Sequence, residues 1–173
     1  MITIERPKPG DFPPYFGAYV HAARGEQLDD ALDMAAHEEA RVFALVPPNK
    51  WEHRYAPDKW SIKEVFQHII DTERVFTYRA LCIARNEQAN LPGMDENAYQ
   101  AEARTALRQP ADILRELKAV RQATIELFKG LDADAVARGG TANGKHITVR
   151  ALGWVIAGHS EHHLRIIRER YLA

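Results

Sequence analysis

Residues 149–167 read VRALGWVIAGHSEHHLRII and carry the most informative pattern in the chain. Apolar side chains recur there at three- and four-residue intervals, which places them on one face of an α-helix. These side chains are Leu152, Val155, Ile156, Ile166 and Ile167. His159 and His163 occupy the same stripe, and a core-facing imidazole needs a partner for a ring nitrogen. A divalent cation bound by both histidines would supply that partner, so the stretch predicts a helix with two metal ligands.

A second predicted helix carries the candidate third ligand, His68. This helix begins after Ser61, where Glu64 completes a capping-box signature, and runs to about Asn86. His68 lies on its inward side together with Val65, Ile69, Thr72, Val75 and Phe76. Three histidines from two packed helices match open catalytic zinc and nickel sites, where water or substrate takes the remaining position. The alternative is a metal-free core in which the histidines only form hydrogen bonds.

The other five of the eight histidines carry weaker signals. His162 lies roughly 60° around the helix from His159, which favours a supporting position at the rim of the site over ligation. His37 falls in a predicted helix rich in Glu and Ala, so we interpret it as structural or exposed. Three more histidines fall in predicted loops: His21, His53 and His146.

Charged residues near His68 have two open interpretations each. Asp71, about one turn further on, either orients an imidazole and accepts a proton near the metal or is a surface carboxylate. Glu73 and Arg79 belong either to a buried ion pair with another helix or to exposed salt bridges of negligible energy. The sequence assigns none of them a catalytic role.

Two tryptophans and the single cysteine are interpreted as packing residues. Trp60 and Trp154 fill the core or a pocket wall, and we expect no organic cofactor to stack on them. Cys82 lies 14 residues beyond His68, about 21 Å along a straight helix, which is too far to share a metal. We therefore expect Cys82 to be a small buried apolar residue rather than a nucleophile.

The composition favours one compact domain over residues 1–173 and excludes several classes of protein. The chain is 46% hydrophobic and 27% charged, as is ordinary for a globular protein. No segment approaches the 18 or so consecutive apolar residues of a membrane helix, and the N-terminus lacks the apolar stretch of a signal peptide. A net charge of −1 without a basic run gives no footprint for nucleic acid. One cysteine fits a reducing compartment, so we expect a cytoplasmic protein.

Periodicity and capping signals predict four long helices. They span residues of about 24–46, 61–86, 110–130 and from Thr148 onward. A short helix is predicted over 96–104, and residues 138–145 read as a turn-rich linker. We identify no convincing strand pair. The expected fold class is all-α, a four-helix bundle of either up-and-down or crossover connection.

Two common helical metal sites are excluded by their missing motifs. A ferritin-like di-iron bundle needs paired Glu-x-x-His motifs, and no glutamate in the chain is followed by a histidine three residues later. A zincin protease needs H-E-x-x-H, which is also absent.

Several short motifs occur together in an order that matches a known family. They are Lys59-Trp-Ser-Ile62, His68-Ile-Ile-Asp-Thr-Glu-Arg74, Arg79-Ala-Leu81, Leu91-Pro-Gly93, Gly158-His-Ser-Glu-His-His163 and Glu169-Arg-Tyr171. In this combination the chain resembles the DinB-like superfamily of YfiT-like four-helix bundles nearly end to end. The resemblance implies a divalent metal, most often zinc or nickel, held by His68, His159 and His163. It also implies a homodimer.

The resemblance implies chemistry on small molecules. Some relatives are S-transferases that use low-molecular-weight thiols such as bacillithiol or mycothiol, a maleylpyruvate isomerase is more distantly related, and others are described as metal-dependent hydrolases. A cation with open positions lowers the pKa of a bound thiol or water. We therefore expect a metal-dependent S-transferase or hydrolase whose partner is a small molecule, such as a thiol. The alternative is a non-catalytic dimeric bundle with a structural or sensory metal in a stress response.

Overall fold

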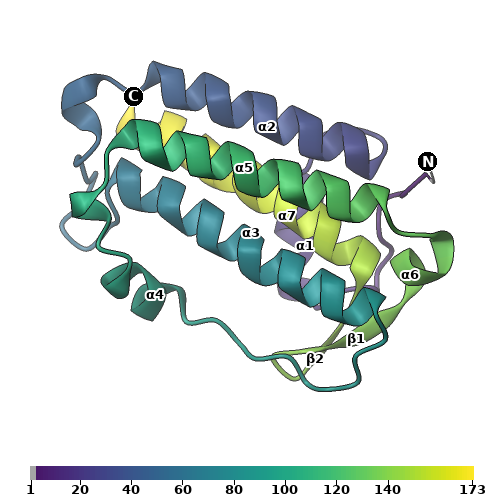
Figure 1. Cartoon of the computed structure of the whole chain (residues 1–173). Helices are drawn as coiled ribbons and strands as arrows, with labels where there is room; N and C mark the ends of the chain where they lie inside the picture. Colours follow the sequence, from purple (N-terminus) through teal and green to yellow (C-terminus); the bar gives the residue numbers. More distant parts are fainter. Residues whose placement is uncertain (1–2) are drawn as a thin grey trace.

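The computed structural model describes residues 3–173, and four long helices form its bundle (Figure 1). They are α2 (Leu28–Leu45), α3 (Ile62–Ala84), α5 (Pro110–Lys129) and α7 (Val149–Ile166). The predicted four-helix bundle is confirmed, and each predicted boundary falls within a few residues of the observed one. Among residues 3–173, no helix combines the length and apolar character needed to cross a membrane.

The helix ends form where the sequence supplies capping residues. The hydroxyl of Ser61 accepts a hydrogen bond from the backbone N–H of Glu64, whose carboxylate accepts one from the Ser61 N–H at 2.7 Å. This is the predicted capping box. The hydroxyl of Thr148 likewise accepts from the N–H of Ala151 at 3.1 Å, and Pro110 occupies the first turn of α5. Ser61 and Thr148 therefore fix the first residues of α3 and α7, the two helices that carry the candidate ligands.

The connection between α3 and α5 is a crossover. α5 and α7 each pack against both α2 and α3, so the consecutive helices α2 and α3 are not neighbours in the bundle. α3 and α5 run in the same direction, and residues 85–109 return along the bundle between them (Figure 1). This segment carries α4 (Glu96–Glu102) and the 3₁₀ turn η3 (Thr105–Leu107). Of the two predicted connections, the crossover is therefore the observed one.

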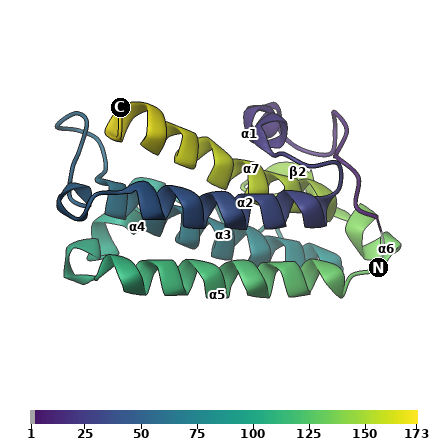
Figure 2. The same ribbon diagram turned by 90° about the horizontal axis from the view of Figure 1, so that it is seen from above.

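Short elements complete the fold. They are η1 (Pro14–Phe16), α1 (Gly17–Ala22), η2 (Pro48–Lys50), α6 (Ala133–Ala137) and the π-helical turn η4 (Ile167–Tyr171). α1 packs on α7, and Figure 2 shows it on the side of the bundle away from α5. The pattern did not predict α1, because a helix this short owes its stability to packing rather than to its own sequence.

The expectation that the chain has no strand pair is wrong. β1 (Gly139–Ala142) and β2 (Lys145–Thr148) form an antiparallel hairpin within the predicted linker. Asn143 and Gly144 form its two-residue turn, with φ of 50° and 68°. Positive φ at both positions matches the twist of a hairpin, and Asn-Gly tolerates it. Four-residue strands are too short to show an alternating pattern.

The core consists of two apolar clusters at opposite ends of the bundle. One joins the first half of α2 and α7 to the second half of α3 and α5, and the other joins the remaining halves. Between them lies a set of buried polar side chains, which we call the polar layer: Glu39, Glu73, Arg121 and Ser160. The histidines occupy the same level of the bundle, between apolar residues such as Ile156 and Leu164 of α7.

Candidate metal centre

The bundle brings the three predicted ligands together. His68 of α3 and His159 of α7 are buried, and His163 of α7 is half-buried. Each offers one ring nitrogen, and these three atoms all lie within 4.8 Å of one another. The Nε2 atoms of His68 and His159 are 3.0 Å apart, although the residues are 91 positions apart in the chain. We call these three residues the histidine cluster.

The histidine cluster fits a divalent cation by donor type and protonation, and the 3.0 Å between Nε2 of His68 and Nε2 of His159 suits two ligands of one metal. Zinc–nitrogen bonds of about 2.0–2.1 Å place neighbouring donor nitrogens roughly 3–4 Å apart. Burial lowers the pKa of His68 to about 4. Burial also lowers the pKa values of His159 and His163, and the neighbouring imidazoles lower them further. All three rings are therefore neutral at pH 7, which is the form that binds a metal.

A threonine, not the predicted aspartate, is the neighbour of the His68 ring. The hydroxyl of Thr72 lies 3.4 Å from Nδ1 of His68, on the side of the ring away from His159. A partner at Nδ1 fixes the orientation of an imidazole whose Nε2 binds a metal. Asp71 instead accepts a hydrogen bond from Nε2 of Gln67 at 3.0 Å and lines a different hollow with Tyr99. Of its two interpretations, the structure therefore supports the carboxylate outside the cluster.

A cavity of about 480 Å³ opens beside the histidine cluster. One face of α3 lines it, because His68, Thr72, Phe76 and Arg79 follow one another at helical spacing. Aromatic rings form much of the remaining wall: Tyr15 and Phe16 of η1, Tyr19 of α1, and Trp60, which precedes α3. The Trp60 ring centre lies 4.7 Å from that of His68, in agreement with its interpretation as a pocket wall. The volume suits a small molecule.

α1 covers the histidines from the outer side. The ring of Tyr19 meets the rings of His159 and His162 edge-on, each at 5.3 Å between centres. His162 is half-buried and its ring centre lies 5.2 Å from that of His163, which places it at the rim of the cluster. The close approach depends on Gly158, because a Cβ there would overlap the carbonyl oxygen of Tyr19.

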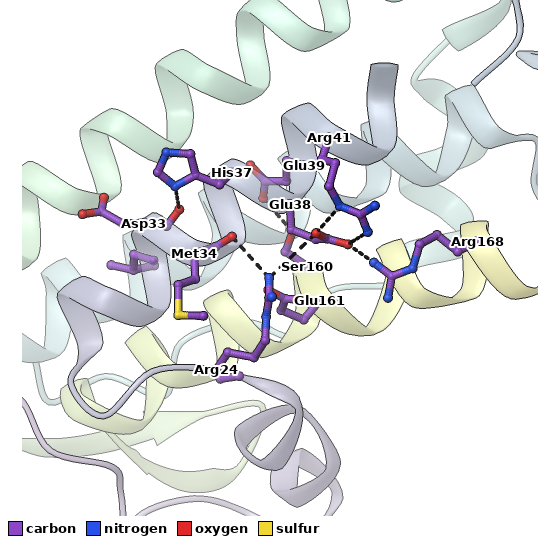
Figure 3. A network of polar contacts seen from close by, with 12 residues as sticks. Arg24, Asp33, Met34, His37, Glu38, Glu39, Arg41, Ser160, Glu161 and Arg168 are labelled. Carbon is purple, nitrogen blue, oxygen red and sulfur yellow. Dashed lines mark hydrogen bonds and ion pairs between the residues drawn. The ribbon is translucent and has the colours of Figure 1, made fainter. Parts of the chain in front are cut away.

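Ion pairs on the surface of α7 hold this cover in place (Figure 3). Arg24, which follows α1, donates from Nε to the carboxylate of Glu161 at 2.9 Å. Glu38 of α2 accepts from Arg41 at 2.7 Å and also pairs with Arg168 of η4. Glu161 lies between the two α7 ligands in sequence, so this network ties α1 and α2 to the ligand-bearing turn.

The polar layer supports α7 from inside the bundle. Arg121 of α5 donates to Glu73 of α3 at 2.9 Å and to Glu39 of α2 at 2.8 Å. Ser160, next to His159, donates to the same Glu39 oxygen at 2.6 Å. Glu73 therefore belongs to a buried ion pair, one of its two predicted interpretations. The carboxylates raise the pKa of Arg121 against the effect of burial, whereas burial raises the pKa of Glu39 to about 7.

The remaining candidates lie outside the cluster. Trp154 is fully buried and donates from Nε1 to the carbonyl of Glu5, and Cys82 is half-buried against an apolar cluster. Nδ1 of His37 lies 2.9 Å from the carbonyl of Asp33 at an exposed position. The other three histidines are exposed: His21, His53 and His146.

Comparison with known proteins agrees with this fold. The model of the DinB superfamily matches residues 27–167. The structure is similar to YfiT from Bacillus subtilis, described as a probable metal-dependent hydrolase with an unusual four-helix bundle topology. The two chains are 16% identical with a TM-score of 0.71, over 95% of this chain and 91% of YfiT.

A second solved structure shares the bundle. It is a mycothiol-dependent maleylpyruvate isomerase, with 13% identity and a TM-score of 0.64. All of this chain is covered, but it spans only 64% of the isomerase. No curated protein matches the sequence. Because the family model covers most of the chain and the fold is that of YfiT, this chain belongs to the DinB superfamily.

Proposed function

We propose that this chain binds a divalent metal, zinc or nickel, through His68, His159 and His163 and acts on a small molecule as a thiol-dependent S-transferase or a hydrolase. One observation carries the proposal: three neutral imidazoles converge on the wall of a cavity large enough for a small molecule. Within residues 3–173, no carboxylate joins the cluster. Three protein ligands are typical of catalytic sites, whereas structural sites use four.

Each part of the site has a role in this proposal. A bound divalent cation supplies Lewis acidity, which lowers the pKa of a thiol or a water molecule. The three histidines hold the cation, and Thr72 keeps the His68 ring turned toward it. The aromatic walls and Tyr19 exclude bulk water from the cavity, which strengthens electrostatic interactions inside it.

The choice between a thiol and water rests on the relatives and on metal chemistry. YfiT is described as a probable metal-dependent hydrolase, and the isomerase as mycothiol-dependent. A soft thiol suits zinc or nickel, which favours the transferase. We also propose that residues 1–173 act as one domain in a homodimer, as the family resemblance implies. Size-exclusion chromatography with light scattering would measure the oligomeric state.

Elemental analysis tests the metal proposal directly. Wild type, His68→Ala, His159→Ala and His162→Ala are purified identically without a tag and then incubated with zinc or nickel. We expect near-stoichiometric metal in wild type and in His162→Ala, and its loss in the other two variants. A wild type that binds neither metal would leave the histidines as core residues that only bond to one another.

A second experiment separates the enzyme from a structural or sensory bundle. Metal-loaded protein is mixed with low-molecular-weight thiols and monochlorobimane as the electrophile, and with ester and amide substrates for hydrolysis. Turnover that His159→Ala loses supports the enzyme. Metal that raises the unfolding temperature without any turnover favours the non-catalytic alternative.

A further inference from the structure

Arg79 is a buried cation in the wall of the cavity. It lies on the same face of α3 as His68 and Thr72, and its side chain is only 6% exposed. A buried arginine is ordinarily paired with a carboxylate, because an uncompensated charge away from water costs several kcal/mol. We therefore expect a negatively charged group to pair with Arg79.

The described residues supply Arg79 with an incomplete set of acceptors. Nη2 donates to the carbonyl oxygen of Pro92 at 2.7 Å. Nε is buried and has no hydrogen-bond partner within residues 3–173. The titratable groups that act on the pKa of Arg79 are the phenols of Tyr15 and Tyr99, while burial lowers it. Within residues 3–173, no carboxylate forms an ion pair with Arg79.

Glu96 is the acidic residue among those that line the cavity. Glu96 and Arg79 form no ion pair, although both line the cavity. The side chain of Glu96 is exposed, whereas that of Arg79 is buried. Among residues 3–173, the guanidinium of Arg79 is therefore a positive charge in the cavity wall without a paired carboxylate.

The guanidinium lies within reach of a molecule that also touches the histidine cluster. Its central carbon is 5.3 Å from the centre of the Phe76 ring, and that ring centre is 6.4 Å from the centre of the His159 ring. Arg79 and the His159 imidazole are therefore separated by less than about 12 Å, with an aromatic surface between them. A small molecule can span this distance.

We propose that Arg79 binds a carboxylate group of the substrate, so that the cavity selects small carboxylic acids whose apolar part lies on Phe76 and whose other end faces the histidines. The planar guanidinium matches a carboxylate with two parallel hydrogen bonds, and the cavity supplies the desolvation that makes such a pair selective. This inference deepens the proposed function, because it names the substrate class of the same cavity. It does not require that a metal be bound.

A matched ligand pair tests the inference by affinity alone. NMR titration measures the dissociation constants of 3-phenylpropionate and 3-phenylpropionamide, which differ in charge but hardly in shape. Wild-type protein is measured both loaded with zinc and after removal of metal by a chelator. We expect the acid to bind at least about tenfold more tightly than the amide in both forms, as for a charge-assisted hydrogen bond.

Variants separate the positive charge of Arg79 from its structural contact with Pro92. Arg79→Gln should bring the acid-to-amide ratio to about one with little change for the amide, and Arg79→Lys should retain part of the preference. Arg74→Gln is the matched control on α3, because Arg74 is exposed and pairs with Glu116. It should keep the wild-type ratio.

Three results would overturn the inference. The first is a wild type that binds the acid no more tightly than the amide. The second is an equal loss of both ligands in Arg79→Gln, because that assigns Arg79 only the support of Pro92. The third is a preference that requires zinc and survives Arg79→Gln, because the metal then binds the carboxylate. A preference that persists without metal would support the inference even if no metal-dependent activity exists.

Discussion

The three imidazoles of the histidine cluster differ in what holds each ring. His68 has Thr72 at its Nδ1 atom and Trp60 against its face. His159 is covered by Tyr19 and Phe76, whereas His163 is half-buried beside His162. Since a ring held by packing and one hydrogen bond needs little reorganisation to bind a cation, His68 and His159 would be the better-positioned ligands of the proposed metal.

The hydroxyl of Thr72, which lies beside Nδ1 of His68, can be removed by a substitution that leaves all three histidines in place. Thr72→Val keeps the shape of the side chain and deletes the group at Nδ1 of His68. We expect the zinc dissociation constant to rise about tenfold, as for other changes to groups that orient ligands, with little change in the unfolding temperature of the metal-free protein. Competition with a chromophoric chelator measures the affinity.

Thr77→Val is the control for this change. Thr77 lies on the same helix and shares a hydrogen bond with Thr124, away from the histidines. Its substitution should leave zinc affinity unchanged. Equal affinities in wild type and both variants would mean that packing alone orients His68.

Individual residues differ in how far the sequence predicted them. The histidines were predicted because polar residues at apolar positions of a helical stripe need a reason to be there. Arg121 offered a similar signal, since it follows Ile113 and Leu117 at four-residue spacing, but its carboxylate partners lie on two other helices. Arg79 was recognised as a candidate for pairing. That no carboxylate of residues 3–173 pairs with Arg79 emerges only from the packed structure.

At the scale of elements, the contact between α1 and α7 depends on one missing side chain. Gly158→Ala places a methyl group against the backbone of Tyr19, which cannot give way as a flexible side chain can. We expect a loss of about 1–3 kcal/mol in the free energy of unfolding and weaker zinc binding, because α1 must move off His159. Urea unfolding measures the first quantity, and chelator competition the second.

An alanine elsewhere on α7 provides the comparison. Arg165 is exposed, and Arg165→Ala should change the free energy of unfolding by less than about 0.5 kcal/mol. If Gly158→Ala changed the free energy of unfolding as little as Arg165→Ala, α1 would not be packed closely on α7 in solution.

Elements were predictable where they contain their own signals. α3 carries a long amphipathic stripe and a capping box, so its boundaries followed from residues 61–86. α1 and α6 are held by contacts with α7, which lies more than 100 residues beyond α1 and directly follows the hairpin after α6. Local patterns contain no information about such contacts, and for this reason both helices were missed.

Arg121 joins three of the four long helices, so its loss tests how the bundle is held together. Arg121→Met leaves Glu39 and Glu73 buried without a counter-charge. We expect a loss of about 3–5 kcal/mol in the free energy of unfolding at pH 7. The control is Arg115→Met on the same helix, where the side chain is 73% exposed. A loss below about 1 kcal/mol at Arg121 would mean that water reaches the two carboxylates.

At the scale of the whole molecule, the polar layer and the histidine cluster lie at one level of the bundle and separate the two apolar clusters of the core. The histidine cluster joins α3 and α7, and the polar layer joins all four long helices. Polar groups at the centre of a bundle weaken the apolar core. These polar groups also hold the ligand-bearing part of α7 in position, because Ser160, the residue after His159, donates a hydrogen bond to Glu39 of α2.

The charge balance of this layer makes stability depend on pH. Burial raises the pKa of Glu39, Arg121 lowers it, and the carboxylates of Glu73 and Glu161 raise it further. In the folded protein that pKa is about 7, against about 4.5 when exposed. Between these values the unfolded chain releases the proton and the folded chain keeps it. Glu39 therefore lowers the stability of the fold as pH rises from about 4.5 to about 7, and its effect is constant above that window.

Glu39→Gln imitates the protonated carboxyl group at every pH. We expect the variant to be more stable than wild type, and this difference to be larger at pH 7.5 than at pH 5 by at least about 1 kcal/mol. Urea unfolding of the metal-free proteins at both pH values measures this difference, and titration of the histidines cancels because both proteins contain them. A variant that is less stable than wild type at pH 7.5 would mean that Arg121 and Ser160 keep Glu39 ionised. In that case the attraction to Arg121 would outweigh the cost of burying a second carboxylate at the centre of the bundle.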